Sequence, residues 1–208
     1  FTLFPAAMTY LSGETGSVII MLGVAYLMLY FGGADWKWVL VITSVIVLGV
    51  AGIFAYGIIG GSSDYRLLRI LAFLDPHAYN LDEGLQLLRS QEPIGSGGLS
   101  GVGLFVPGSM SQLNFIPEDW TDFIFATIGE AVGFIGTLII VLLFAFMILR
   151  MLYLSRFTYD KFGRLVIIGV MSMIFLHVFQ NVAMTIGLMP ITGIPLPFLS
   201  YGGSNLLT

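Results

Sequence analysis

The chain has 208 residues, of which 57% are hydrophobic and only 10% are charged, whereas a soluble domain is about 25% charged. The mean hydropathy of +0.96 excludes a soluble globular enzyme, because 8 basic and 12 acidic side chains cannot cover so apolar an interior. The absence of cysteine excludes disulfides and thiol nucleophiles. A net charge of −4 without a basic tract argues against nucleic acid as a partner. We therefore expect an integral membrane protein.

Four segments reach the roughly 20 apolar residues that a membrane span requires. The third is over-long, which predicts a tilted helix or one that projects at one end. Both ends of the chain lie in further apolar stretches, so we expect a piece of a longer protein. The expected fold is an all-α polytopic helical bundle, with residues 1–208 in a single membrane domain. The four spans run from about Thr15 to Phe31, Trp38 to Ile59, Phe123 to Leu154 and Leu165 to Met189.

Basic residues predict the orientation of these spans. The short turn between the third and fourth spans holds Arg150, Arg156, Lys161 and Arg164, and short basic loops face the cytoplasm. Residues 61–121 then form a large extracytoplasmic loop, which is too long for a passive connection.

Short helices and tight turns are expected within this outer loop. Residues 65–74 and residues 82–89 each have the apolar spacing of a short helix. The run Gly95-Ser96-Gly97-Gly98 follows, and its backbone N–H groups are candidates to hold a phosphate. As a bare pattern, such a run is more often an ordinary turn.

Three acids lie near the ends of apolar segments. Asp122 begins the third span, where partial desolvation makes a carboxylate a stronger base; alternatively it satisfies the helix dipole, with Thr121 as cap. Glu130 lies two turns further in, at a depth where an ionisable group is costly, and its alternative role is a hydrogen bond to a neighbouring helix. Glu14, before the first span, also fits a simple N-terminal acid.

Polar residues also occur in the middle of the fourth span. His177, Gln180 and Asn181 lie within one turn of each other, and hydrogen bonds between helices explain them better than a proton relay does. The proline- and glycine-rich stretch from Pro195 to Ser204 predicts a fixed re-entrant turn, which a membrane tolerates only where it lines a cavity.

Together these segments resemble the SEDS family (shape, elongation, division and sporulation), whose members polymerise peptidoglycan glycan strands. Residues 111–115 and 192–197 are more similar to the RodA branch than to the FtsW branch. The family has ten spans, so the chain would hold spans six to nine. The matching motifs are Phe73-Leu74-Asp75-Pro76, Ile94-Gly95-Ser96-Gly97-Gly98, Thr121-Asp122-Phe123-Ile124-Phe125, Ile128-Gly129-Glu130 and Pro195 to Ser204.

This resemblance implies an inverting glycosyl transfer from lipid II during cell elongation, with undecaprenyl pyrophosphate as the leaving group. Asp122 falls on the family's essential aspartate and would act as the base. A class B penicillin-binding protein and membrane lipids are the implied partners. The implied location is the bacterial cytoplasmic (inner) membrane, with the active site on the extracytoplasmic side. The substrate-binding candidates are Arg66, Arg69, Arg89, Gly95, Ser96, Gly97, Glu130, Pro197, Ser200, Tyr201, Gly202 and Gly203.

The outer loop has three arginines among seven acids, so it is short of positive charge for the departing phosphates. We therefore expect a divalent cation, Mg²⁺ or Mn²⁺, held by Asp122 and Glu14. The family pattern usually has basic residues where this chain has Trp120 and Val102, and no acid where it has Glu92. Two alternatives stay open. Polar residues within the spans, Glu130, His177 and Gln180, would fit a lipid-linked precursor transporter, and the missing basic residues would favour a non-catalytic scaffold for a cell-wall synthase.

Overall fold

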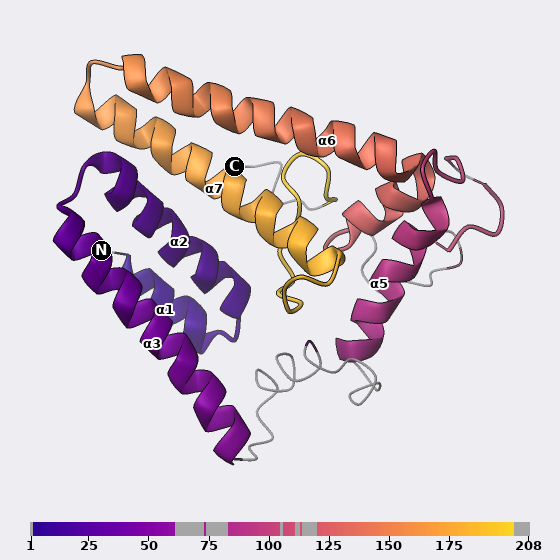
Figure 1. Ribbon diagram of the computed structural model, residues 1–208, viewed down its shortest axis with the longest axis horizontal. Coiled ribbons are helices and arrows are strands. Elements are labelled where there is room, and N and C mark those ends of the chain that lie inside the picture. Colours follow the sequence, from indigo (N-terminus) through magenta and orange to yellow (C-terminus); the bar gives the residue numbers. More distant parts are fainter. Residues whose placement is uncertain are drawn as a thin grey trace.

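The computed structural model of the chain describes residues 2–60, 73, 83–104, 106–110, 113 and 120–201. Within these ranges every regular element is a helix, which confirms the expected all-α fold (Figure 1). The expected helix over residues 65–74 lies outside the described residues, apart from Phe73. The helices are α1 (Leu3–Leu11), α2 (Thr15–Gly32), α3 (Trp36–Gly60), α5 (Glu83–Gly97), α6 (Ile124–Phe157) and α7 (Lys161–Thr185).

The four expected spans correspond to α2, α3, α6 and α7. By length and composition, α2, α6 and α7 are able to cross a membrane. Within α3, the residues whose side chains are described form a shorter apolar stretch, Trp36–Val45. The sequence predicted that the last span continues to Met189, but α7 ends at Thr185. It ends there because Gly187 takes a left-handed backbone (φ 77°), which lets Leu188 N–H donate to Ala183 O at 2.8 Å in a Schellman turn.

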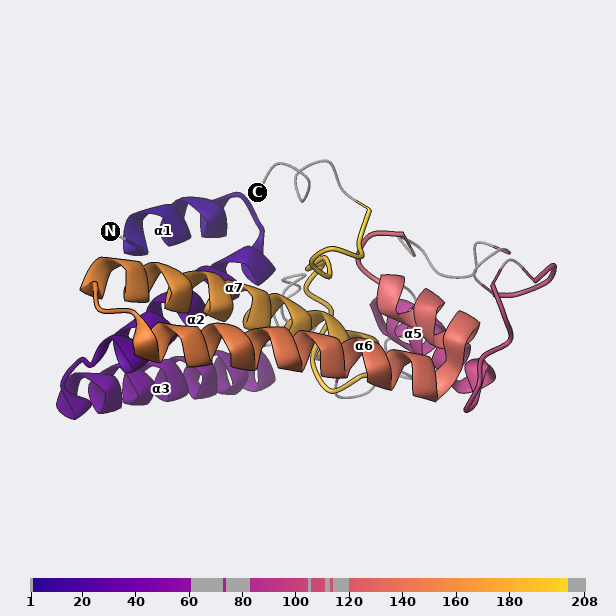
Figure 2. The same cartoon turned by 90° about the horizontal axis from the view of Figure 1, so that it is seen from above.

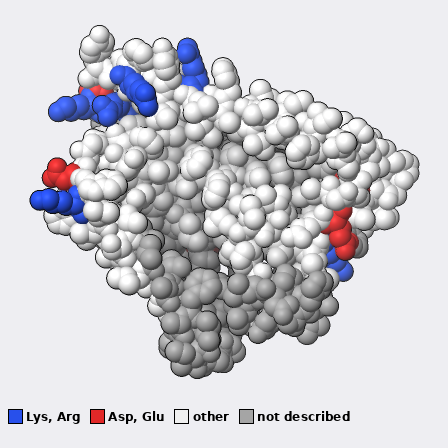
Figure 3. All heavy atoms as spheres, viewed as in Figure 1, with Lys and Arg blue, Asp and Glu red and all other residues white. Residues whose placement is uncertain are grey.

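The helices pack as an antiparallel group, and the basic residues of the turn between α6 and α7 lie at one end of it. α2 and α7 lie side by side, and α6 covers α7 (Figures 1 and 2). Lys and Arg side chains gather where α6 joins α7, at the upper left of Figure 3. There the Arg164 side chain donates to Phe31 O at 3.0 Å, which ties this turn to the end of α2. Figures 1 and 2 show that α7 runs in the opposite direction to both α2 and α6.

The over-long third span is two helices joined at Gly133. This residue has φ 70° and ψ −171°, a backbone region that is essentially restricted to glycine. The chain reverses direction there, so that residues 124–132 fold back from the long part, residues 134–157 (Figures 1 and 2). The excess length is thus explained by a break, and the expectation of one tilted or projecting helix is wrong.

The loop after α5 supplies the backbone bonds that α6 loses at this break. Phe134 N–H donates to Gly98 O (2.9 Å) and Ile135 N–H donates to Leu99 O (3.1 Å). In return, the carbonyls of residues 130 and 131 accept from the N–H groups of residues 102 and 103, at 2.9 and 3.0 Å. Because unsatisfied backbone is very costly in a membrane, this exchange makes the break stable.

Two apolar clusters fix the first part of α6. One contains Phe123, which is 2% exposed, together with Leu87, Ala126 and Ile191. The other contains Phe125, which packs with Phe144, Val178 and Leu196. Successive aromatic residues are therefore anchored in different clusters, and the segment that carries Asp122 is held between α5 and α7.

Candidate active site

Asp122 lies in a turn whose backbone is bonded to α7 and to the segment that follows α7. Three consecutive carbonyls are held: Trp120 O accepts from Tyr201 N–H (2.9 Å), and Thr121 O from the Ser200 hydroxyl (2.6 Å). Asp122 O accepts from Asn181 Nδ2 at 2.7 Å. The turn is thus fixed by residues that lie 59 to 81 positions further along the chain.

The Asp122 side chain is half-buried beside the segment that follows α7. A Cβ built on Gly193 would lie 3.3 Å from Asp122 Oδ2, so the carboxylate rests against that glycine. The N-cap position of α6 is Phe123, so Thr121 is not the N-cap residue that the sequence left open. A fixed carboxylate that is neither fully buried nor fully exposed is suited to accept a proton from a bound hydroxyl.

Glu130 lies next to the break and not deeper in a span. Because the first part of α6 runs towards Gly133 before the chain turns back, the expected position two turns into a continuous span is wrong. The side chain is 3% exposed, and Oε1 accepts from Met110 N–H at 2.7 Å. The observed partner is therefore the backbone of the outer loop, whereas the sequence suggested a neighbouring helix.

Gly95, Ser96 and Gly97 form the last turn of α5 and not a loop. Their N–H groups point back into the helix, so the expected phosphate cradle does not form at these residues. Ser96 Oγ donates to Pro93 O at 2.8 Å. A Cβ on Gly97 would overlap the Gly129 carbonyl oxygen, which shows that this glycine is needed for close helix contact.

The stretch from Pro195 to Tyr201 forms the expected irregular turn, in which Phe198 has φ 66°. Pro197 is half-buried, and the Tyr201 ring is 79% exposed. Ser200 Oγ donates to Thr121 O and accepts from Leu196 N–H at 2.7 Å. A substrate bound by Ser200, as predicted, would therefore have to compete with two hydrogen bonds that the Ser200 hydroxyl makes within the protein.

The remaining predicted residues are spread more widely. Arg89 is half-buried on α5. The predicted residues outside the described part of the chain are Arg66, Arg69, Gly202 and Gly203.

Glu14 lies near the same segment as Asp122. It is exposed at the start of α2, and it accepts from the Ser17 hydroxyl at 3.1 Å. Two residues on, Gly16 packs against Thr192 O, while Gly193 faces Asp122. Among the described residues there is no group of three or more His, Cys, Asp or Glu side chains able to hold a metal ion. Two carboxylates fit a cation such as Mg²⁺ only if substrate oxygens complete its coordination.

The polar residues of α7 make structural bonds. Gln180 Nε2 donates to Thr192 Oγ1 at 3.1 Å, and Asn181 is fully buried and bonded to the Asp122 turn. His177 Nδ1 lies 2.8 Å from Met173 O, within its own helix. Hydrogen bonding was therefore the better expectation for Gln180 and Asn181, although their partners lie in loops and not in neighbouring helices.

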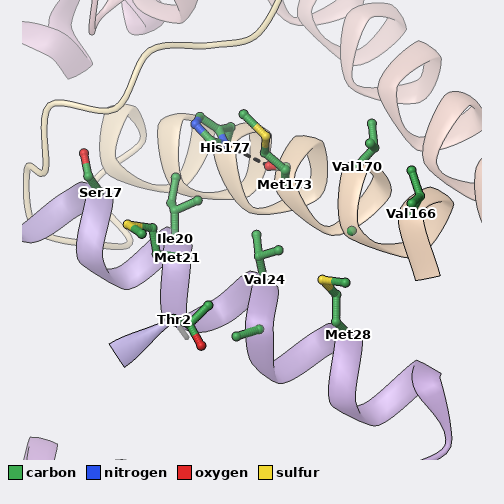
Figure 4. Close-up of a pocket in the computed structure, with 12 residues that line it drawn as sticks. Thr2, Ser17, Ile20, Met21, Val24, Met28, Val166, Val170, Met173 and His177 are labelled. Atoms are coloured by element: carbon green, nitrogen blue, oxygen red, sulfur yellow. Dashed lines mark hydrogen bonds between the residues drawn. The ribbon is translucent and has the colours of Figure 1, made fainter. Parts of the chain in front are cut away.

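A groove of about 550 Å³ runs between α2 and α7 (Figure 4). Its walls are mostly apolar, with Met21, Met28 and Met173 among the lining side chains, and His177 at one end. His177 is the titratable side chain among the residues that line the groove. The groove is suited to hydrocarbon, and the residues that line it do not include Asp122.

Sequence reasoning missed two features of the site. Gly193 lies against the Asp122 carboxylate, and the available signal was its place in residues 192–197, the stretch that resembles the RodA branch. Asn181 bonds to the Asp122 backbone, and the available signal was an amide side chain in an otherwise apolar helix.

Comparisons with known proteins agree on one family. The family model of the cell cycle proteins FtsW, RodA and SpoVE matches residues 1–208. The peptidoglycan glycosyltransferase MrdB of Escherichia coli K12 is 34% identical over 203 residues, which are 98% of this chain and 54% of MrdB. The stage V sporulation protein E of Bacillus subtilis is 37% identical over 93% of this chain and covers 50% of that protein.

Two further matches extend this result. The peptidoglycan glycosyltransferase RodA of Treponema pallidum is 42% identical over 69% of this chain and 33% of its own length. A solved structure described as the structural coordination of polymerization and crosslinking by a peptidoglycan synthase complex matches with a TM-score of 0.76 and 26% identity. That match covers 99% of this chain and 55% of the solved chain. The chain spans about half the length of the relatives that match most of it.

Proposed function

This chain belongs to the family of the cell cycle proteins FtsW, RodA and SpoVE, and it is part of a multi-pass membrane protein. We propose that it carries the catalytic part of a peptidoglycan glycosyltransferase. The substrate is lipid II, and the role is glycan polymerisation for cell elongation. The names of MrdB and RodA, and the match to a peptidoglycan synthase complex, support this proposal. The structural observation that carries it is the half-buried Asp122 carboxylate on a fixed backbone turn.

The reaction is a single displacement with inversion. Asp122 accepts the proton of the acceptor sugar hydroxyl as that oxygen forms a bond to the anomeric carbon of the donor. The bond from this carbon to the pyrophosphate oxygen breaks, and undecaprenyl pyrophosphate leaves with the electron pair. Pyrophosphate is a weakly basic leaving group, so no general acid is required. The main contribution of the protein is to hold the carboxylate against the attacking hydroxyl.

Positive charge near the leaving group comes from arginines and a divalent cation. The outer loop contains three arginines, Arg66, Arg69 and Arg89, and the structure describes Arg89, which lies on α5. Mg²⁺ or Mn²⁺ held by Asp122, Glu14 and the substrate phosphates would supply the rest of the charge. Chelation is expected to abolish turnover, and readdition of Mg²⁺ to restore it. Undiminished turnover after chelation would contradict the cation proposal without affecting Asp122.

We place the protein in the bacterial cytoplasmic membrane, with Asp122 on the extracytoplasmic side. The grouping of basic residues at the opposite end, where α6 joins α7, supports this orientation. The partner that we propose is a class B penicillin-binding protein, because the matching solved structure is a complex of polymerization and crosslinking activities.

The experiment compares wild type and Asp122→Ala as full-length proteins with the transpeptidase partner and labelled lipid II. Wild type is expected to form polymer, and Asp122→Ala to lose at least about 100-fold in rate. Asp160→Asn is the matched control, since it removes an acid at the other end of the molecule and asparagine still caps α7. Equal polymer from wild type and Asp122→Ala would disprove the role of Asp122.

The two alternatives have less support. A transporter was suggested by Glu130, His177 and Gln180, but the bonds observed for Glu130 and Gln180 are structural, to Met110 and Thr192. A non-catalytic scaffold gains no support from an Asp122 turn that is held by three hydrogen bonds. Wild type that folds and binds its partner, but forms no polymer, would favour the scaffold.

A further inference from the structure

We propose that Asn181 and Ser200 are positioning residues, which hold the peptide backbone of Asp122 and do not contact substrate. This inference rests on the function proposed above, in which Asp122 is the base. It differs from the role predicted for Ser200 in the sequence analysis, which was substrate binding.

The three held carbonyls lie before the hydrogen-bonded part of α6. The first bond there runs from Ala126 N–H to Phe123 O at 2.9 Å, so the carbonyls of Trp120, Thr121 and Asp122 have no role in the helix ladder. A carbonyl that is shielded from water needs a partner, and each of these three receives one from residues 181, 200 or 201. Side chains supply two of the three bonds, and those two can be removed by substitution.

The donors are themselves fixed. Asn181 is 0% exposed, and its amide nitrogen donates both to Asp122 O at 2.7 Å and to Ile194 O at 2.8 Å. Ser200 Oγ donates its single proton to Thr121 O and accepts from Leu196 N–H. The amide nitrogen and the hydroxyl proton are therefore both committed to backbone groups, which leaves neither side chain with a free donor for a ligand.

These bonds set the direction of the Asp122 carboxylate. Asn181 joins the Asp122 carbonyl to Ile194, while Gly193, the neighbour of Ile194, lies against Asp122 Oδ2. One amide thus fixes both the backbone of the base and the surface on which its side chain rests. A displacement of the base by a few tenths of an ångström lowers the rate of the chemical step more than it lowers the affinity for substrate.

The test measures kcat and KM for lipid II polymerisation by the full-length protein with its partner. Ser200→Ala and Asn181→Leu are each expected to lower kcat by about 10- to 100-fold with KM within about twofold of wild type. Ser200→Thr keeps the hydroxyl and is expected to restore most of kcat. Ser155→Ala is the matched control, because Ser155 is a buried serine that bonds its own helix at the other end of the molecule.

Lipid II binding separates positioning from contact. In the Asp122→Ala background, Ser200→Ala is expected to leave the Kd for lipid II unchanged. A rise in KM with unchanged kcat, or a weaker Kd in that background, would overturn the proposal and make Ser200 a binding residue. Thermal unfolding in the same detergent identifies a variant that does not fold. If Asn181→Leu is such a variant, Ser200→Ala and its threonine rescue still decide the question.

Failure of this inference is distinct from failure of the proposed function. If Asp122→Ala abolishes turnover while Ser200→Ala and Asn181→Leu keep the kcat of wild type, the positioning role is wrong and the base remains. If Asp122→Ala keeps turnover, the assignment of the base is wrong, and the positioning role falls with it.

Discussion

The two parts of α6 have similar apolar sequences and very different surroundings. In the first part, residues 124–132, Phe125, Ala126, Gly129 and Glu130 are all buried. In the second part, Leu142 and Leu143 are 58% and 62% exposed. An apolar stretch in a membrane protein is compatible with lipid or with protein on every side. Within α6, the break at Gly133 separates the part that is mainly surrounded by protein from the part with large exposed apolar side chains.

The hydrogen bonds differ in the same way. Apart from Phe134 and Ile135, whose N–H groups bond to the loop after α5, the second part uses the ordinary bonds of a helix. The first part and the turn before it are bonded to the loop after α5, to α7 and to the segment after α7. The candidate base belongs to the region with long-range bonds. Precision at this site therefore depends on the first part, and the second part serves mainly to cross the membrane.

The largest expected effect comes from removing the break. Gly133→Val places a branched side chain at a glycine-only backbone conformation, where a Cβ would overlap Gly101 N. We expect a loss of about 3 kcal/mol or more in unfolding free energy, measured by thermal unfolding of the full-length protein in detergent. The control is Gly52→Val on α3, where a Cβ meets nothing within 4 Å. Equal stability of the two variants would show that the break is not required.

An intermediate effect is expected at Glu130, the buried acid of the first part. Glu130→Leu leaves Met110 N–H without the carboxylate acceptor at 2.7 Å, which costs about 1–3 kcal/mol. Glu130→Gln keeps an acceptor oxygen and is expected to unfold close to wild type. If Glu130→Gln instead weakens lipid II binding with unchanged stability, the acid binds substrate as the sequence predicted.

The smallest effect is expected on the exposed face of the second part. Leu143→Ala removes an exposed side chain and should change the unfolding free energy by less than about 0.5 kcal/mol. Phe144→Ala, its buried neighbour, is the contrasting variant, with an expected loss of about 3 kcal/mol. A large loss for Leu143→Ala in the full-length protein would show that another segment packs on this face.

Most of the helices were predictable from the sequence, because a membrane span requires a continuous run of apolar residues. The expected Thr15 to Phe31 became α2, and Trp38 to Ile59 became α3, with ends that differ by at most two residues. Asp122 was also recognisable, because an acid stands out at the start of an apolar run. The family motifs around it carried the rest of the assignment.

The break and its consequences were not predictable. Gly129, Gly133 and Gly136 are equivalent in the sequence, and Gly133 is selected by bonds to residues 98–99, more than 30 positions away. Gly97 was expected in a turn, but its place in a helix follows from close contact with Gly129. Such choices depend on contacts between distant segments, which local patterns do not contain.

The exchange between residues 98–103 and α6 joins only backbone groups, and this has a consequence for insertions and deletions. The N–H and carbonyl groups involved are the same in every residue, so the side chains of Leu99 and Val102, which are 70% and 45% exposed, are free to differ without loss of the bonds. The number of residues is not free to differ, because one extra residue would shift every pair out of register. Val102 in place of a basic residue therefore leaves the architecture intact, whereas a single-residue deletion here would undo it.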